Sequence, residues 1–322
     1  MRTNLILLLL IILTWFSCGN ILSDPEDSID YRTEMRSFVQ EISSFAKTQD
    51  PNFAVIPQNG HQLVVNGNNL ASSYLNVVDG LAQENLFFGY PNDDLSTTVT
   101  ATDRWLNFLN LGKEAGKTIL VTDYVSTPLR VNRSYSQNQA LDFISFAAPE
   151  RNLTTIPSYP NPLPGENSNN IDQLSEARNF LYLLNKSEFS GAEDFISSIE
   201  NTNYDMIIID AFINGRLYSE QEMARLRQKE NGGTRMVISY MSIGEAEEYR
   251  YYWQDGWRVR DPEWLFSENP NWAGNYKVEY WNSDWQDIIY GSENSYLQKI
   301  IDSGFDGVYL DIIDGFQFFE NQ

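Results

Sequence analysis

Residues 205–210 read Asp-Met-Ile-Ile-Ile-Asp, an apolar run with an acid at each end. The same pattern of an aspartate, four residues and a second acid recurs at 79–84 (DGLAQE) and 306–311 (DGVYLD). A short apolar run bounded by polar residues predicts a buried strand. An ionised acid after such a strand is costly unless it faces a polar cavity. We therefore expect each first acid at the start of a strand and each second acid in a cavity at its end.

Short β-rich runs alternate with helical patterns from Asn52 onward. The predicted strands are Phe53–Pro57, Gly80–Glu84, Thr118–Asp123, Phe180–Leu184, Asp205–Asp210, Met236–Met241, Lys277–Trp281 and Gly307–Asp311. The predicted helices are Met35–Ala46, Asp103–Ala115, Gln137–Phe146, Gly191–Asn201, Glu220–Glu230 and Asn294–Ser303. Eight alternating units predict an α/β fold with a parallel sheet closed into a (β/α)8 TIM barrel. The alternative is an open, doubly wound sheet, and the last helix is expected to be very short or missing.

The first residues predict export. Arg2 precedes an apolar run, Leu5–Leu13, which is too short to span a bilayer and has the length of a signal-peptide core. Cys18 follows as the only cysteine and fits the acylated first residue of a bacterial lipoprotein anchored to a membrane. An uncleaved anchor is the alternative and leaves the same compartment. We divide the chain into a signal segment at 1–18, a tether and helix at 19–50, and a catalytic domain at 51–322.

The chain of 322 residues is acidic, with 22 Lys and Arg against 44 Asp and Glu. Nucleic acid is excluded as a partner, because phosphate binding needs a basic face. His61 is the only histidine, which excludes histidine triads and multi-histidine metal sites. No cofactor is expected, although a divalent cation among the acids stays open. Aromatic residues make up 14% and suit stacking on sugars, although they also fill large cores.

Polar and aromatic side chains follow several of the predicted strands. The predicted substrate-binding residues are Asn59, Glu84, Asp123, Tyr124, Tyr240, Glu245, Arg250, Trp281, Asp311 and Asp314. A barrel brings the carboxyl ends of its strands to one face, so these residues are expected to line a cup. Glycoside hydrolysis needs one protonated and one ionised carboxyl group. A crowded acidic cup can supply both, because neighbouring acids push their pKa values apart.

Several segments resemble a known family in their sequence and order. They read YDMIIID at 204–210, SYMSIGEAE at 239–247, NPNW at 269–272, VEYW at 278–281 and GFDGVYLD at 304–311. Together they resemble glycoside hydrolase family 114, including its bacterial and archaeal branch, over roughly residues 50 to 320. Members studied as enzymes are endo-α-1,4-polygalactosaminidases with a TIM barrel. The resemblance therefore implies a glycoside hydrolase that cleaves a polysaccharide, with α-1,4-linked polygalactosamine as the implied substrate.

The resemblance maps the two catalytic acids onto Asp210 and Glu279, with Glu245 and Asp311 in reserve. One acid would attack C1 or activate water, and the other would protonate the glycosidic oxygen. A carboxyl separation of about 5–5.5 Å favours retention, and about 6.5–9.5 Å favours inversion. The alternative function is a non-catalytic carbohydrate-binding surface lipoprotein, which would not need these acids as acid and base. A deacetylase or lyase is disfavoured, because no histidine cluster supplies a metal site or strong base.

Overall fold

The computed structural model describes residues 29–322, of which Tyr31–Gln322 form one compact unit. The predicted signal segment and Cys18 lie outside the described residues, so export and acylation stay predictions. Within residues 29–322, no helix has both the length and the apolar character that crossing a membrane requires.

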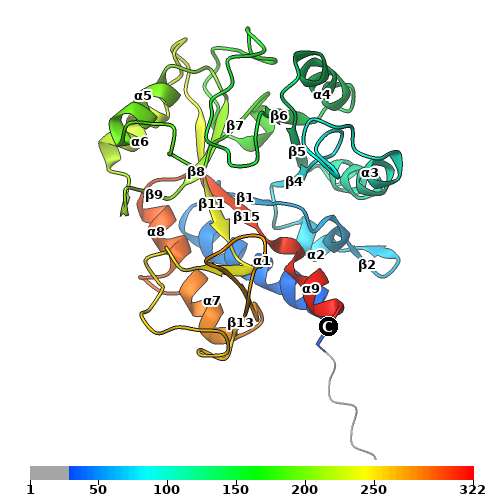
Figure 1. The fold of residues 1–322 in the computed structure, drawn as a ribbon, viewed down its shortest axis with the longest axis vertical. Coiled ribbons are helices and arrows are strands. Elements are labelled where there is room, and N and C mark those ends of the chain that lie inside the picture. Colours follow the sequence, from blue (N-terminus) through cyan, green and yellow to red (C-terminus); the bar gives the residue numbers. More distant parts are fainter. Residues whose placement is uncertain (1–28) are drawn as a thin grey trace, which may run out of the picture. The chain divides into compact units, whose positions relative to one another are not determined.

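Parallel strands alternate with helices along the chain (Figure 1). Five strands form a sheet in the order β1-β15-β11-β8-β7, and three form a second sheet in the order β4-β5-β6. Their bounds are β1 Ala54–Pro57, β4 Gly80–Glu84, β5 Thr118–Tyr124, β6 Ile144–Ala148, β7 Leu181–Tyr182, β8 Met206–Asp210, β11 Met236–Ser242 and β15 Gly307–Asp311. Every pairing within these two sheets is parallel. The predicted α/β class and parallel pairing are confirmed.

The two parallel sheets adjoin at both of their edges. Beyond β1, Gln58 forms a parallel bridge with Ala82 of β4, and the Asn59 N–H donates to the Ala82 carbonyl at 2.8 Å. At the other edge β6 contacts β7. From β1 through β4, β5, β6, β7, β8 and β11 to β15, neighbours in the chain are therefore neighbours in space.

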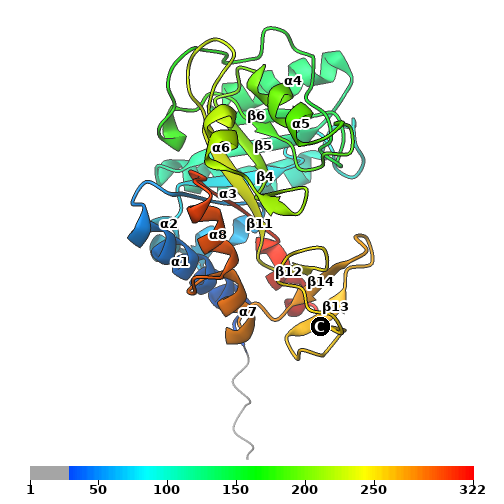
Figure 2. The ribbon, with the colours of Figure 1, turned by 90° about the vertical axis from the view of Figure 1, so that its left-hand side faces the viewer.

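Helices follow most of the strands and bury one apolar face each. Their bounds are α1 Tyr31–Gln49, α2 Ser72–Leu75, α3 Val99–Glu114, α4 Pro128–Ala140, α5 Ala192–Glu200, α6 Glu220–Leu226, α7 Ser283–Ile289, α8 Tyr296–Asp302 and α9 Phe316–Glu320. Helix α1 buries Phe38, Val39 and Ile42 at helical spacing, as predicted. It packs beside α2, α8 and α9, and Figure 2 shows α1 with α2 and α8. Helix α9 has five residues, which confirms the very short last helix.

Two predicted elements are wrong. The segment Lys277–Trp281 is not a strand of the parallel sheets, because β14 (Asn275–Val278) pairs antiparallel with β12 (Glu245–Glu247) and β13 (Leu265–Glu268). A parallel strand buried on both faces needs a continuous apolar run, whereas this segment carries charged residues. The predicted helix Gln137–Phe146 combines the end of α4 with the start of β6. In a short apolar run, the period of the apolar residues does not distinguish a helix from a buried strand.

The first acids of the three repeated segments hold the starts of their strands. Each pairs with a cation and accepts a backbone N–H from another segment: Asp79 pairs with Lys47 and accepts from Val55, Asp205 pairs with Lys229 and accepts from Arg178, and Asp306 pairs with Arg227 and accepts from Val237. The second acids are the last residues of β4, β8 and β15. The predicted place of each acid is therefore confirmed.

Candidate active site

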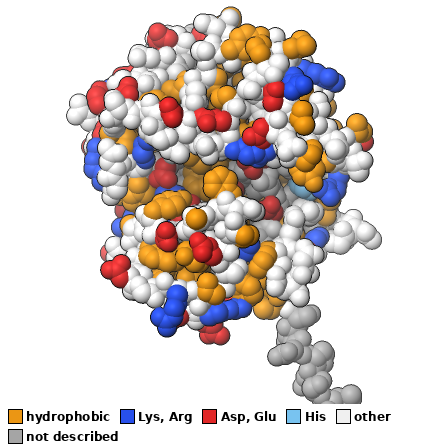
Figure 3. Space-filling model, in the orientation of Figure 1, with side chains coloured by type: hydrophobic (Ala, Val, Ile, Leu, Met, Phe, Trp, Pro, Cys, Tyr) orange, Lys and Arg blue, Asp and Glu red, His pale blue; other side chains and the backbone are white. Residues whose placement is uncertain are grey.

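A cavity of about 880 Å³ lies at the carboxyl ends of the parallel strands. Nine of the predicted site residues line it: Asn59, Glu84, Tyr124, Asp210, Tyr240, Glu245, Arg250, Asp311 and Asp314. Figure 3 shows acidic, basic and hydrophobic side chains intermingled on one face of the molecule. On this face the excess negative charge is therefore not gathered into one patch.

Asp210 ends β8 and is held by hydrogen bonds to both carboxylate oxygens. Its Oδ1 accepts the Phe212 N–H at 2.7 Å, and its Oδ2 accepts Nη1 of Arg250 at 2.7 Å. Arg250 is buried and also donates from Nε to Glu247 at 2.5 Å. Burial lowers the pKa of the neighbouring Lys186 ammonium, and the charge of Asp210 opposes that shift. Asp210 therefore has two cations close to it in the cavity, Arg250 and Lys186.

Asp311 ends β15 in surroundings of the opposite kind. Its Oδ2 accepts the Tyr240 hydroxyl at 2.8 Å, and its Oδ1 accepts the Ile312 N–H at 2.8 Å. Burial, followed by the charge of Glu84, raises the pKa of Asp311 to about 8. The same two causes raise the pKa of Asp314 to about 6. At neutral pH, Asp311 is therefore largely protonated.

Two further acids of the cavity are fixed by donors. Tyr124 donates from its hydroxyl to Oε1 of Glu84 at 2.5 Å, and Asn59 donates from Nδ2 to Oε2 at 3.0 Å. Glu245 is 1% exposed, and its Oε1 accepts from Asn269 and Lys277. Its Oε2 is buried with no hydrogen-bond partner among the described residues. Glu245 is therefore held mainly by contacts within the protein.

Exposed aromatic side chains form the rim of the cavity. Tyr249, Tyr251 and Trp272 line it and are 65%, 41% and 54% exposed. The predicted site did not contain them, although Trp272 closes the NPNW segment. It also lacked Arg151, Tyr182 and Lys186, which line the cavity too. Tyr182 comes from the predicted strand Phe180–Leu184, where an apolar run gives no sign that its hydroxyl reaches a cavity.

Three predicted site residues do not line the cavity. Asp123 is fully buried and accepts from the Ser134 hydroxyl at 2.6 Å and from the Phe87 N–H at 2.9 Å, so it holds a loop. Glu279 forms an ion pair with Arg260 at 2.6 Å. Trp281 packs on Phe319, with ring centroids 4.7 Å apart. Asp210 and Glu279 are not brought together in this cavity, and the catalytic role of Glu279 stays a prediction.

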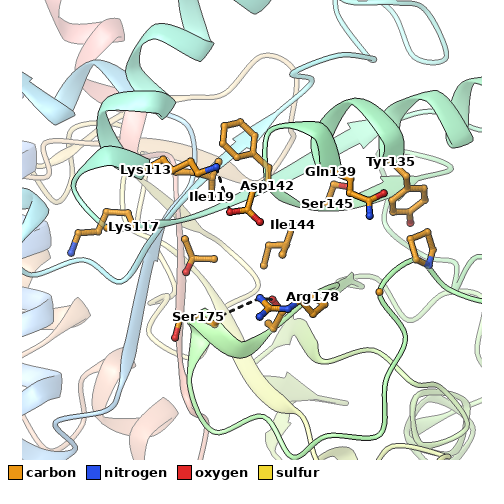
Figure 4. Close-up of a pocket in the computed structure, with 16 residues that line it drawn as sticks. Lys113, Lys117, Ile119, Tyr135, Gln139, Asp142, Ile144, Ser145, Ser175 and Arg178 are labelled. Atoms are coloured by element: carbon orange, nitrogen blue, oxygen red, sulfur yellow. Dashed lines mark hydrogen bonds and ion pairs between the residues drawn. The ribbon is translucent and has the colours of Figure 1, made fainter.

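A second cavity, of about 410 Å³, lies near the starts of β5 and β6. Figure 4 shows Lys113 facing Asp142, Arg178 bonded to Ser175, and Lys117 directed away from them. Since no predicted site residue lines it, this cavity is not the candidate active site. In the part of the chain that the structure describes, no cluster of three or more His, Cys, Asp or Glu is arranged to hold a metal ion.

The acids that end β8 and β15 and the arginine between them fall in one half of the chain. Residues 166–322 match the model of glycoside-hydrolase family GH114. The resemblance predicted from the sequence motifs is therefore confirmed over this half. The GH114 segment contains Asp210, Arg250 and Asp311, whereas Glu84 and Tyr124 of the same cavity precede it.

Similar proteins are known from archaea and bacteria. The chain is 41% identical over 155 residues to an uncharacterized protein of Methanocaldococcus jannaschii, covering 47% of this chain and 42% of that protein. It is 36% identical over 124 residues to one of Thermotoga maritima, covering 38% and 37% of the two chains. It is 37% identical over 127 residues to one of Deinococcus radiodurans, covering 39% of each. The chain thus spans about two fifths of the length of these relatives.

Proposed function

We propose that the protein is a glycoside hydrolase that cleaves a polysaccharide with two carboxyl groups of the 880 Å³ cavity. The observation that carries the proposal is the contrast between two acids at strand ends. Asp210 bonds to the Arg250 guanidinium, whereas Asp311 is buried beside the carboxylate of Glu84. Glycoside hydrolysis needs one carboxylate and one carboxylic acid. Two acids in different surroundings can differ in protonation in this way.

In the proposed reaction, Asp311 donates its proton to the glycosidic oxygen while Asp210 attacks C1 or activates water. The Tyr240 hydroxyl donates to Asp311 and stabilises the carboxylate that proton transfer leaves behind. Arg250 and the Phe212 N–H hold Asp210 as a hydrogen-bond acceptor before the substrate arrives. Asp311 takes the place that the family resemblance gave to Glu279, because it lines the same cavity as Asp210.

We also propose that the parallel strands close into a (β/α)8 barrel. The support is that the five-stranded and three-stranded sheets adjoin at both edges, beside β1 and β4 and beside β6 and β7. The site at the carboxyl ends of the strands agrees with this architecture, in which loops at that face carry the chemistry.

The proposed substrate is α-1,4-linked polygalactosamine, whose free amines carry positive charge. Support comes from the GH114 segment and from Glu84, Glu245 and Asp314 in the cavity, because carboxylates bind ammonium groups well. The test is reducing-end release from α-1,4-galactosamine oligomers by the full chain, beside an Asp210→Asn variant. Release by the native protein alone supports the proposal, and no release from this or any other glycan contradicts it.

A second function is favoured by the ion pair that Asp210 forms with Arg250. A carboxylate oxygen that is already bonded to a buried guanidinium is less free to attack C1 or activate water, which suits a non-catalytic carbohydrate-binding protein. Binding of the same oligomers without reducing-end release would support this function.

The pH dependence of the reaction is expected to follow Asp311. Because Asp311 acts in its protonated form, kcat/KM should fall as the pH rises through its raised pKa of about 8. An Asp311→Asn variant should lose roughly 10²–10⁴-fold in rate on a polysaccharide. It should lose much less on an aryl glycoside, whose leaving group departs without a proton. A rate that stays flat above pH 8, or equal losses on both substrates, would assign the acid elsewhere.

The aromatic rim is expected to contribute binding. Replacing Trp272 by Ala should raise KM about tenfold and leave kcat nearly unchanged, because a stacked ring stabilises substrate and transition state alike. Tyr159→Ala is the matched control, since Tyr159 is 42% exposed and does not line the cavity. A fall in kcat at constant KM would contradict a purely binding role for Trp272.

A further inference from the structure

A chain of hydrogen bonds runs from His61 to Glu84. Nδ1 of His61 lies 3.1 Å from Oε1 of Gln83. Gln83 donates from Nε2 to Oδ1 of Asn59 at 3.2 Å, and Asn59 donates from Nδ2 to Oε2 of Glu84 at 3.0 Å. We refer to His61, Gln83 and Asn59 as the relay. It joins the histidine, buried among Trp105 and Phe108, to an acid of the cavity.

The other contacts of the relay fix its direction. Nε2 of Gln83 also donates to the Glu84 carbonyl at 2.9 Å, so the amide oxygen of Gln83 faces His61. Because a carbonyl oxygen only accepts, Nδ1 of His61 must carry a proton. Oδ1 of Asn59 also accepts the Glu84 N–H at 3.1 Å, which fixes the second amide. Each group therefore has one orientation, and the relay ends in a donor directed at Glu84.

The backbone supports the same arrangement. Asn59 has a φ of 61° and Gly60 a φ of 53°, and both values lie in the left-handed region that asparagine and glycine accept most readily. The bond from the Asn59 N–H to the Ala82 carbonyl ties this turn to β4. With Tyr124 donating to Oε1, both oxygens of the Glu84 carboxylate have a donor. Glu84 is thus held in place from two sides.

Glu84 is one of several groups that act on Asp311. Glu84 and Asp311 line the same cavity, at the ends of two strands, β4 and β15, that flank β1. The charged and titratable groups facing Asp311 are Glu84 from β4, Asp314 from η3 (Ile313–Gly315), Tyr240 from β11, Tyr182 from β7 and Tyr309 from β15 itself. After burial, the charge of Glu84 is the largest cause that raises the pKa of Asp311. A negative charge disfavours a second one nearby, so Glu84 favours the protonated form of Asp311.

We propose that Glu84 is a positioning residue that keeps Asp311 protonated, and that the relay from His61 holds Glu84 where it does so. The use of Asp311 as the acid rests on the proposed function, whereas the coupling between the two carboxyl groups can be measured without any substrate.

The first test follows Asp311 directly by ¹³C NMR of protein labelled at the aspartate carboxyl carbons. The resonance of Asp311 is the one lost in Asp311→Asn. In the native chain it should titrate with a midpoint of about 8. Glu84→Gln removes one charge and should lower the midpoint by about one unit or more, a tenfold change in the ionisation constant. Glu114→Gln makes the same change at an exposed position of α3 and should leave the midpoint unchanged.

The second test breaks the relay and leaves the charge of Glu84 in place. In His61→Phe the new ring can keep the packing on Phe108, where the centroids are 5.1 Å apart, but it cannot donate to Gln83. Burial lowers the pKa of His61 to about 4, so the substitution removes no charge at neutral pH. The midpoint of Asp311 should fall, by less than in Glu84→Gln. A role of His61 in stability alone would lower the melting temperature and leave this midpoint unchanged.

The only histidine of the chain gives a third readout. In ¹⁵N-histidine-labelled protein without an affinity tag, His61 should be the neutral Nδ1–H tautomer at neutral pH. An Nε2–H tautomer would overturn the direction of the relay. An unchanged Asp311 midpoint in Glu84→Gln would overturn the coupling itself, whatever the protein's activity. If the predicted shifts occur but no glycan is cleaved, the proposed function fails and the coupling stands.

Discussion

Replacing Asp210 by Asn is expected to lower kcat/KM on a true substrate by about three orders of magnitude. The amide keeps an oxygen that can accept the Phe212 N–H, so the end of β8 should stay in place. It removes the negative charge that the reaction needs, and it leaves the buried Arg250 with Glu247 as its remaining ion-pair partner. The measurement is the rate of reducing-end release, with circular dichroism to show that the variant is folded.

Two control variants show whether the loss of activity is specific to Asp210. Asp302→Asn makes the same change at an exposed position at the end of α8 and should leave the rate unchanged. Glu279→Gln removes the acid that pairs with Arg260 outside the cavity and should retain most of the activity. A loss in Glu279→Gln equal to that in Asp210→Asn would return the second catalytic role to the residue implied by the family resemblance. Full activity of Asp210→Asn would contradict the assignment of Asp210.

Replacing Asp205 by Asn is expected to lower the free energy of unfolding by about 3–5 kcal/mol. The carboxylate of Asp205 and the ammonium of Lys229 are 2.9 Å apart, and both side chains are fully buried. Removing one charge leaves the other buried without its counter-ion, and desolvation of that charge is the main cost. The measurement is the shift of the urea unfolding midpoint at constant slope.

The control for Asp205 is an ion pair on the surface. Asp142 is 91% exposed in its side chain and lies 3.4 Å from Lys113. Asp142→Asn should change the free energy of unfolding by less than about 1 kcal/mol, because water screens the exposed pair. Asn also accepts the left-handed φ of 56° found at this residue. Equal effects of the two substitutions would contradict the burial argument.

The repeated acids show how far local sequence could predict the site. An apolar run bounded by two acids allows few structures, because each ionised acid must reach a cation, backbone donors or a polar cavity. Asp205 and Asp210 meet this requirement at opposite ends of β8, and Asp306 and Asp311 do so on β15. The predicted strand Lys277–Trp281 was wrong as part of the parallel sheet, because its segment pairs antiparallel in a separate sheet. Glu279, which the family resemblance supplied, does not line the cavity. The alternation of charged and apolar residues in this segment does predict a strand, but it is typical of a half-buried antiparallel strand and not of a parallel strand buried on both faces.

From its residue pattern alone, the chain specifies parallel strands with acids at their ends and a very short last helix. These features are local, because they depend on the period of apolar residues and on the cost of burying a charge. The resemblance to GH114 rests instead on the order of its motifs, and residues 166–322 match the model of that family. The tertiary structure alone decides which groups surround each of these acids. Arg250 reaches Asp210 from 40 residues away, and Glu84 acts on Asp311 from the other half of the chain. Burial and distant charges set the pKa of a carboxyl group, and only folding brings them to it.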